Sequence, residues 1–513
     1  MYLTQSLHQA LQQRPDSPMT VCGDRVRTTR KVADRVARLA GGFRDLSVAE
    51  GDRVAVLALN SDRYHEIFYA SWWLGAVVNP VNIRWSPEEI AYALDDAGAD
   101  TLLIDDAFLP ALATLRERCP RLRVVIHCGD GDAPEGLTGY EDLIARSAPV
   151  EDLRRGGDAL AALLYTGGTT GRPKGVMVSH QGLMTAAVGG QMITGSALPD
   201  GVNLVAAPMF HIAAIYGWMG QNLMGGTHVF LPSFTPDSVL EAVHKHRINT
   251  LTLVPTMLQM LVDHPRLPDY DLTSVWTAGY GGSVIAEAVL ERAAKAFPNA
   301  GLVQGYGMTE TALISSLGRH DHRNGGARLR SAGRAVAHCE VKIVGADGTA
   351  LPAGEVGEIL CRSDSVMTGY WNRPDETAAA LRDGWMCTGD AGYLDAEGFL
   401  YIVDRMKDMI ISGGENIFSA EVENVLADHP AVATCAVIGL PDERWGEAVH
   451  AVVVLQPGAD ATEEELRDHV RARIAGYKVP RAVEFVRQLP MSGAGKILKR
   501  DLRDERFTPE PGA

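Results

Sequence analysis

The chain has 513 residues, a formal net charge of −16 at pH 7, 46% hydrophobic residues and 22% charged residues. Its length exceeds that of one simple domain, and its composition is that of a globular enzyme. The negative charge argues against a nucleic-acid partner, because phosphate backbones bind to basic surfaces.

The N-terminus and the longest uncharged stretch indicate neither a secretory signal nor a transmembrane segment. Residues 1–6 lack both a basic and an apolar region. Residues 201–236 contain no Asp, Glu, Lys or Arg, but Asn203, Pro208 and a Gly225-Gly226 pair favour a buried strand and helix over a membrane span. The seven cysteines form no CxxC pair. We therefore expect free thiols and a cytoplasmic location.

Short apolar runs alternate with amphipathic stretches over residues 1–403. Runs at 53–58, 101–104, 122–126 and 160–164 are typical of strands, and residues 64–74 have a helical pattern. Such alternation predicts an α/β fold, with a large N-terminal domain of layered, largely parallel sheets and helices.

The pattern changes near Asp404. A strand at 400–403 leads into a short charged linker, 404–408. Beyond it we expect a small α+β C-terminal domain, 409–513, attached by a hinge. Its first helix would have Ser419 as N-cap and run to Asp428, and a hairpin-like region would cover 432–455. A second helix would start at Thr462, with a capping box to Glu465, and stop at Gly476.

A loop rich in glycine and hydroxyl groups follows the apolar run 160–164. Glycines allow the backbone to wrap around an anion, hydroxyls add donors, and Lys174 adds a positive charge. The loop is not a Walker A motif, because Pro173 precedes the lysine and Gly175 follows it. A flexible surface loop is the alternative. We predict a phosphate-binding loop made of Thr166, Gly167, Gly168, Thr169, Thr170, Gly171 and Lys174.

This loop and several later motifs resemble those of the adenylate-forming superfamily, which contains acyl-CoA synthetases, firefly-type luciferases and the adenylation domains of peptide synthetases. The later motifs occur in the family's order at 305–311, 388–390, 404–407, 412–417 and 493–497. The resemblance implies an enzyme that activates a carboxylic acid with ATP as an acyl-adenylate and passes the acyl group to coenzyme A.

The resemblance also implies a nucleotide site. Tyr306 offers a flat ring for adenine, and Gly281 and Gly282 would let the backbone lie against its other face. Core packing is the alternative for Tyr306. Val284 stands where the family often has proline, which makes this turn less rigid. The other residues expected to contact the nucleotide or coenzyme A are Gln304, Gly305, Gly307, Thr309, Asp390, Arg405, Ser412, Gly413 and Gly414.

Two carboxylates have separate expected roles. Glu310 is a hard oxygen ligand suited to Mg²⁺ on the ATP phosphates, and by resemblance Thr166 shares that ion. Asp390 can accept hydrogen bonds from the ribose hydroxyls, and Arg405 can donate to ribose or phosphate. A surface ion pair is the alternative for Asp390 and Arg405.

Lys496 resembles the family's C-terminal lysine. It would lie between the substrate carboxylate and the α-phosphate, where one preorganised cation supplies about 3–4 kcal/mol. No general base is needed, because the acid is ionised at neutral pH. The 412–414 loop would serve the second half-reaction. One small domain can present both segments only by rotating, with Lys407 at the pivot.

The acyl pocket is the least defined part. By resemblance, residues 208–214 border it, and His211 either gates the carboxylate or is a core histidine. His211 stands where amino-acid-activating domains have an aspartate, which argues against an amino-acid substrate. We expect an apolar medium- or long-chain fatty acid or an aryl acid. The expected lining is His211, Ile212, Ala213, Tyr216, Val254, Tyr280 and Gly281.

Other functions remain open at this stage. An adenylating enzyme that loads a separate carrier protein is the main alternative to a CoA ligase, and a luciferase-like oxygenase would share the motifs. A nucleotide-binding sensor would not need Lys496 on a hinged domain. The absence of a GxSxG motif disfavours a serine hydrolase. A homodimer is compatible with the sequence.

Overall fold

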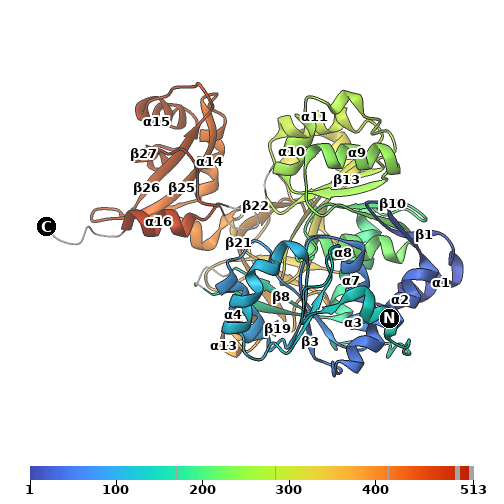
Figure 1. Ribbon diagram of the computed structural model, residues 1–513. Coiled ribbons are helices and arrows are strands. Elements are labelled where there is room, and N and C mark those ends of the chain that lie inside the picture. The colour runs from blue at the N-terminus through green and yellow to red at the C-terminus, as the bar shows by residue number, and fades with distance from the viewer. Residues whose placement is uncertain (168–171, 284, 414, 492–496, 508–513) are drawn as a thin grey trace. The chain divides into compact units, whose positions relative to one another are not determined.

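A computed structural model describes residues 1–167, 172–283, 285–413, 415–491 and 497–507 (Figure 1). The chain divides into two compact units. The first comprises Met1–Val341 and Cys361–Met386, and the second comprises Lys342–Leu360 and Cys387–Ala513. The predicted hinge, 404–408, lies inside the second unit. The domain limits 1–403 and 409–513 therefore stay a prediction.

The first unit contains two large, mostly parallel sheets. In order, one has β16 (Arg334–Ala335), β15 (Ala312–Leu317), β14 (Gly301–Met308), β13 (Thr277–Gly281), β12 (Thr250–Leu253), β10 (Val202–Val205), β11 (Thr227–Phe230), β1 (Pro18–Cys22) and β2 (Arg25–Thr28). The other has β19 (Gly369–Tyr370), β9 (Lys174–Ser179), β8 (Leu160–Thr166), β4 (Val77–Pro80), β3 (Arg53–Leu57), β5 (Thr101–Ile104), β6 (Val124–His127) and β7 (Thr138–Gly139). The β8–β9 and β14–β15 pairs are antiparallel.

Helices form layers with these sheets. A central core joins both sheets to α2 (Thr29–Asp45), α3 (Asp62–Trp73), α7 (His180–Thr194) and α8 (Ile212–Leu223). A second core joins the nine-stranded sheet to α9 (Pro236–His246), α10 (Pro255–Val262) and α11 (Glu287–Ala296), which lie together in Figure 1. A third joins the eight-stranded sheet to α4 (Pro87–Ala97) and α5 (Leu112–Arg118). The remaining helices of this unit are α1 (Gln5–Gln13), α6 (Tyr140–Arg146), α12 (Arg319–Asn324) and α13 (Pro374–Ala380).

Alternation along the strands explains this layering. In β3, Val54 and Val56 belong to the central core, whereas Ala55 and Leu57 belong to the core with α4 and α5. Successive side chains of a strand point to opposite faces, so a strand covered on both faces is apolar throughout. The predicted α/β fold is confirmed.

The second unit is built on a small sheet with helices around it. Its strands are β24 (Glu415–Ile417), β23 (Ile410–Ser412), β26 (Gly446–Leu455), β25 (Val432–Asp442) and β27 (Ala482–Phe485), and its helices are α14 (Ser419–Ala427), α15 (Glu463–Arg471) and α16 (Lys499–Phe507). A further sheet is formed by β17 (Glu340–Val344), β18 (Gly357–Arg362), β21 (Trp385–Leu394), β20 (Leu381–Arg382) and β22 (Leu400–Arg405).

One predicted helix start is wrong, and another is confirmed. Ser419 is not an N-cap but the first residue of α14, and the N-cap is Phe418. The carboxylate of Asp404 caps this helix, accepting hydrogen bonds from Ser419 Oγ (2.6 Å) and from the Ala420 amide (3.1 Å). The Thr462–Glu465 capping box begins α15 as predicted, although that helix ends at Arg471 and not at Gly476.

The uncharged stretch 201–236 forms strands and a helix of the first unit. It contains β10, α8 and β11. Within the described ranges, no helix is both long and apolar enough to cross a membrane. The seven cysteines are all free.

Two fully buried histidines lie close together in the first unit. The rings of His65 and His228 lie 5.7 Å apart, and both residues have 0% exposure. Trp218 Nε1 donates to His65 Nδ1 at 3.0 Å. Burial disfavours the charged imidazole, so it lowers the pKa of His65 well below the usual range and lowers the pKa of His228 to about 3.

We expect unfolding to become easier below about pH 6.5, where histidines of the unfolded chain take up protons that buried His228 cannot. Between pH 7 and pH 5, this residue alone should reduce the free energy of unfolding by about 2 kcal/mol. The check is urea unfolding at both pH values, with His228→Gln as control. An identical pH dependence in the variant and the parent would contradict this assignment.

Candidate active site

The predicted phosphate loop connects two paired strands. Thr166, at the end of β8, and Lys174, at the start of β9, face each other across an antiparallel pair. Gly167 follows Thr166 and is exposed. Gly168, Thr169, Thr170 and Gly171 lie outside the described residues. The two ends of the loop are therefore held side by side by strand pairing.

A short strand links this hairpin to Glu310. Strand β19 pairs with β9, with Tyr370 opposite Val176. The Tyr370 hydroxyl donates to Glu310 Oε1 at 2.8 Å, and the ammonium of Lys174 lies 5.5 Å from the centre of the Tyr370 ring. Burial and the neighbouring carboxylate of Glu310 raise the pKa of Tyr370, so the phenol stays protonated and donates. Lys174 and Glu310 thus contact the same side chain.

Glu310 is a buried carboxylate that fits the expected Mg²⁺ site. Its exposure is 7%. Among the described residues, no group of three or more His, Cys, Asp or Glu side chains could hold a metal ion by itself. Mg²⁺ is commonly bound by one or two carboxylates plus substrate phosphates, so one buried carboxylate fits this mode. The metal roles of Glu310 and Thr166 stay predictions.

Close approach of backbone explains the glycines of the predicted adenine site. A Cβ on Gly281 would lie 2.4 Å from the carbonyl oxygen of Gly305, its neighbour across the β13–β14 pair. A Cβ on Gly307 would lie 1.7 Å from the carbonyl oxygen of Ala312. Gly282 has a φ of +88°, which favours glycine. Tyr306 and Thr309, on either side of Gly307 in the sequence, are partly exposed. Val284 lies outside the described residues.

A narrow cavity of about 50 Å³ lies beside this segment, within the first unit. It is lined by Ala187, Gly190, Gln191, Thr194, Ser196, Ala197, Asn203, Tyr216, Gly217, Gly220, Thr250, Thr252, Thr277, Gly279, Tyr280, Val303, Gln304, Gly305 and Leu313. The cavity thus brings together four residues that the sequence singled out, Tyr216, Tyr280, Gln304 and Gly305. His211, Ile212, Ala213, Val254 and Gly281 are not in this lining.

His211 instead begins the helix that borders the cavity. It is the N-cap residue of α8, and its side chain makes no capping hydrogen bond. Its ring packs against Phe210, with ring centres 4.2 Å apart. Whether this histidine contacts a substrate carboxylate stays a prediction.

Several polar side chains line this cavity. The buried side-chain oxygen of Gln304 has no hydrogen-bond partner within the described part of the chain. The Tyr280 hydroxyl contacts His322 Nε2 at 2.9 Å, and His322 Nδ1 contacts the Gly318 carbonyl at 2.8 Å. A carbonyl can only accept, so Nδ1 carries the proton and Tyr280 donates to Nε2. Tyr280 thus has a partner, whereas the Gln304 oxygen is an acceptor that a bound molecule could use.

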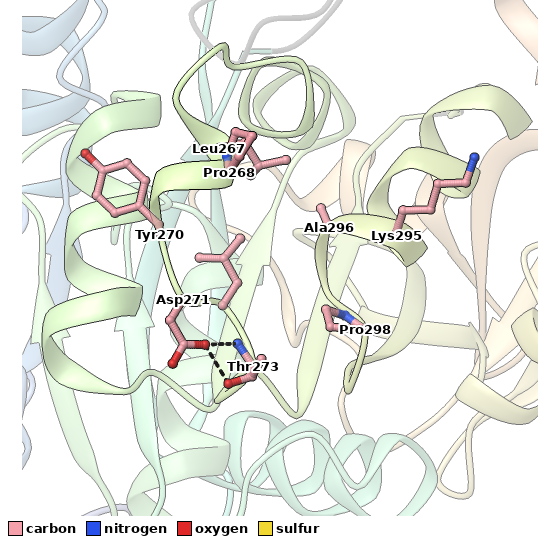
Figure 2. A pocket seen from close by; sticks show the side chains of 9 residues that line it. Leu267, Pro268, Tyr270, Asp271, Thr273, Lys295, Ala296 and Pro298 are labelled. Carbon is pink, nitrogen blue, oxygen red and sulfur yellow. Dashed lines mark hydrogen bonds between the residues drawn. The ribbon is translucent and has the colours of Figure 1, made fainter.

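A second depression, of about 290 Å³, also has polar groups in its lining. It is lined by Leu267, Pro268, Tyr270, Asp271, Leu272, Thr273, Lys295, Ala296 and Pro298. Figure 2 shows the Asp271 carboxylate bonded to the amide (2.9 Å) and hydroxyl (2.6 Å) of Thr273, while Tyr270 and Lys295 point in different directions. Its polar groups do not converge, so we do not consider it the substrate site.

In the second unit, Asp390 and Arg405 lie together. They face each other across the β21–β22 pair, and Arg405 Nε lies 2.9 Å from Asp390 Oδ1. The Asp390 side chain is 8% exposed and that of Arg405 is 44% exposed. The aspartate is thus held at the sheet surface with its cation beside it, an arrangement that agrees both with a ribose site and with a structural ion pair.

The predicted pivot has several charged neighbours in the same unit. Burial lowers the pKa of Lys407, and Arg405 and Arg503 lower it further. Arg503, in α16, bonds Asp408 at 3.1 Å. Ion pairing thus connects the 404–408 segment to the helix that follows the Lys496 motif. Lys496 itself lies outside the described residues.

The loop expected to serve the second half-reaction is partly described. Ser412 is buried at the end of β23. Gly413 has a φ of +61°, and its amide donates to the Trp445 carbonyl at 2.7 Å. A Cβ there would lie 2.9 Å from the Trp445 ring, which explains the glycine. Gly414 lies outside the described residues.

Sequence reasoning missed several residues of the first unit. Tyr370 and Glu376 contact Lys174 of the predicted loop, although they lie about two hundred residues after it in the sequence. Gly217 and Gly220 line the cavity from α8. Their spacing, three residues apart on a predicted helix, is the one signal that could have placed them on a shared face.

Comparison with known proteins places this geometry in a family. Residues 7–371 match the protein family described as AMP-binding enzyme, and residues 421–496 match its C-terminal domain. A feruloyl-CoA synthase of Amycolatopsis sp. is 42% identical over 480 residues, which cover 93% of each chain. A fatty acid–[acyl-carrier-protein] ligase of Streptomyces coeruleorubidus is 35% identical over 508 residues, covering 98% of this chain and 95% of the relative.

Solved structures agree. The amide bond synthetase McbA from Marinactinospora thermotolerans superposes with a TM-score of 0.88 at 32% identity, over 99% of this chain and 100% of the other. The family match covers most of the chain, and both halves of the family's architecture are present in order. This chain is therefore an enzyme of the AMP-binding, adenylate-forming family, related to the acyl-CoA synthetases, as its motifs predicted.

Proposed function

We propose that this enzyme activates an aromatic carboxylic acid with ATP and transfers the aryl-acyl group to coenzyme A. The observation that carries the substrate proposal is the cavity beside β13 and β14. Its lining combines the aromatic rings of Tyr216 and Tyr280 with hydroxyl and amide groups of Asn203, Thr250 and Gln304. Asn203 already contacts His228 Nδ1, and Thr250 already donates to the Ser196 carbonyl. An aliphatic chain would leave the buried Gln304 oxygen without a partner, which is unfavourable. A ring bearing a hydroxyl group would satisfy this oxygen.

The similarity to the feruloyl-CoA synthase supports the same choice. Ferulate is an aromatic acid with a ring hydroxyl. The unpartnered Gln304 oxygen is an acceptor that such a hydroxyl could satisfy. Of the apolar fatty and aryl acids predicted from the sequence, we therefore propose a ring-substituted aryl acid as the substrate.

In the proposed reaction, the acid's carboxylate attacks the α-phosphorus of ATP and pyrophosphate leaves. Both reactants are anionic, so cations must offset their repulsion. Lys174 and the predicted Lys496 supply fixed positive charge, and Thr166 adds a hydroxyl donor. Glu310 and Thr166 would hold Mg²⁺, which neutralises phosphate charge when bound. Asp390 and Arg405 would bind the ribose, and Tyr306 would stack on adenine.

The second half-reaction transfers the acyl group from AMP to the thiol of coenzyme A. Ser412 and Gly413, from the second unit, are proposed to border the thiol's path. The relatives differ in the acceptor that their names state: coenzyme A for one and an acyl carrier protein for another. Carrier-protein loading is therefore the alternative, and coenzyme A is favoured by the higher identity.

An acid panel tests the proposal. With ATP and coenzyme A, we expect kcat/KM for ferulate and 4-hydroxycinnamate to exceed that for octanoate and palmitate by at least about tenfold, since a site with unpaired polar groups rejects an analogue lacking the matching group. Thioester and AMP are measured together by chromatography. A preference for fatty acids would overturn the substrate assignment, and adenylate formation without thioester would favour a carrier protein.

Filling the cavity from α8 should change acid use without unfolding the protein. A Cβ on Gly220 would meet nothing within 4 Å, so valine fits the helix but occupies cavity volume. We expect Gly220→Val to raise KM for the aryl acid by about tenfold or more, with Gly220→Ala intermediate. The Kd for ATP, from calorimetry, should stay unchanged. Equal KM values in all three proteins would show that the acid binds elsewhere.

A further inference from the structure

The predicted phosphate-binding lysine already has an anionic partner in this structure. Lys174 forms a salt bridge with Glu376, which lies in the first turn of α13. Both side chains keep some contact with solvent, since Lys174 is 20% exposed and Glu376 is 39% exposed. An ion pair at such a position is accessible to an incoming anion.

Tyr370 keeps Lys174 near the site while this pair exists. The lysine ammonium lies over the Tyr370 ring, at 5.5 Å from its centre, and the Tyr370 hydroxyl donates to Glu310. The ring attracts the cation whether or not a carboxylate is present. Lys174 can therefore exchange one anionic partner for another without leaving the aromatic ring.

A second cation, Arg373, lies close to Glu376. Arg373 Nε lies 3.8 Å from Glu376 Oε1. Arg373 is itself fixed, because its guanidinium bonds Asp96 at 3.0 Å and the Tyr92 hydroxyl at 2.8 Å. When Lys174 moves to a phosphate, the carboxylate of Glu376 keeps a positive neighbour, which lowers the cost of breaking the Lys174 pair.

We propose that Glu376 competes with the ATP phosphates for Lys174 and so sets the affinity of the enzyme for ATP. The proposal rests on the proposed role of Lys174 as a phosphate ligand. In the nucleotide-free enzyme, the Glu376 carboxylate is paired with the Lys174 ammonium. Binding of ATP replaces it with a phosphate oxygen, and Glu376 stays beside Arg373. No covalent bond changes in this exchange.

Competition and positioning predict opposite changes in ATP affinity when the charge of Glu376 is removed. If Glu376 only positioned Lys174, removing its charge would weaken ATP binding. If it competes, removing the charge strengthens binding, because the phosphate no longer displaces an anion. A partly exposed pair of this kind is worth a modest amount, so we expect the Kd for ATP to fall by about 3- to 10-fold in Glu376→Gln.

A matched control is available in the same helix turn. Asp375 is also an acidic residue in the first turn of α13, but it is exposed, and no salt bridge to Lys174 is found for it among the described residues. Asp375→Asn removes the same charge and the same interaction with the helix N-terminus. Its ATP affinity should equal that of the parent.

The experiment measures Kd for ATP by isothermal calorimetry in the parent, Glu376→Gln, Asp375→Asn, Lys174→Met and the double variant Lys174→Met/Glu376→Gln. We expect tighter binding in Glu376→Gln alone, and no effect of that change when Lys174 is absent. An unchanged or higher Kd in Glu376→Gln, or an equal gain in the Lys174→Met background, would overturn the proposal. A parent protein that binds no ATP would instead refute the proposed function.

Discussion

Replacing Lys496 by alanine is expected to slow acyl-adenylate formation by about 10²- to 10³-fold, the scale for loss of one preorganised group that stabilises developing charge. The same variant should still convert a supplied acyl-adenylate and coenzyme A to the thioester. The reason is that the lysine is needed only while the carboxylate approaches the α-phosphate. The two half-reactions are measured separately, the first as pyrophosphate release without coenzyme A.

The split between the half-reactions is what tests the two-conformation mechanism. Loss of both half-reactions to the same extent, in a variant that stays folded by circular dichroism, would remove its support. Lys407→Pro is the complementary variant, because proline fixes φ near −65° at the predicted pivot. It should impair one half-reaction more than the other, with the Kd for ATP unchanged.

Replacing Glu310 by glutamine is expected to slow adenylate formation by about 10²-fold and to shift its dependence on Mg²⁺ to higher concentration. Glu310 is a buried carboxylate, and the described residues contain no cluster of acidic or histidine side chains that could replace it. Glutamine keeps the shape but removes the negative charge that, in the proposed role of Glu310, would bind the ion. Initial rates measured against Mg²⁺ concentration give both quantities.

Tyr370→Phe is the matched control for this experiment. It removes the hydroxyl that donates to Glu310 but leaves the carboxylate in place. The loss should be smaller, about tenfold, near the lower end of the range for one hydrogen bond to a charged group. A Glu310→Gln variant with the parent's Mg²⁺ dependence would exclude Glu310 as the magnesium ligand.

The layered fold could be predicted because its signals are local. The apolar runs at 53–58 and 101–104 became β3 and β5, and the Thr462–Glu465 capping box begins α15. In each case, a few neighbouring residues contain the whole pattern. The start of α14 was misjudged because its cap, Asp404, lies fifteen residues before Ser419, outside any local pattern.

The motifs of the candidate site could be predicted from the sequence, but the contacts between residues distant in the sequence could not. Nothing near Lys174 in the sequence indicates Glu376 or Tyr370, because strand pairing of β19 with β9 brings them together. The acyl pocket was predicted around His211, whereas the cavity that we propose for the acid is lined in part by α8 and by strands of the sheet. Successive side chains of a helix point in different directions, so the residues of α8 that line the cavity depend on how the helix is rotated about its axis. The uncharged stretch 201–236 does not reveal that rotation.

The most direct test of acyl-adenylate chemistry is acid-dependent exchange of labelled pyrophosphate into ATP in the absence of coenzyme A. Exchange requires reversible formation of an enzyme-bound acyl-adenylate. We predict exchange with ferulate present and none without acid, followed by release of AMP and feruloyl-CoA when coenzyme A is added. Formation of ADP and phosphate, or exchange that requires coenzyme A, would contradict the mechanism.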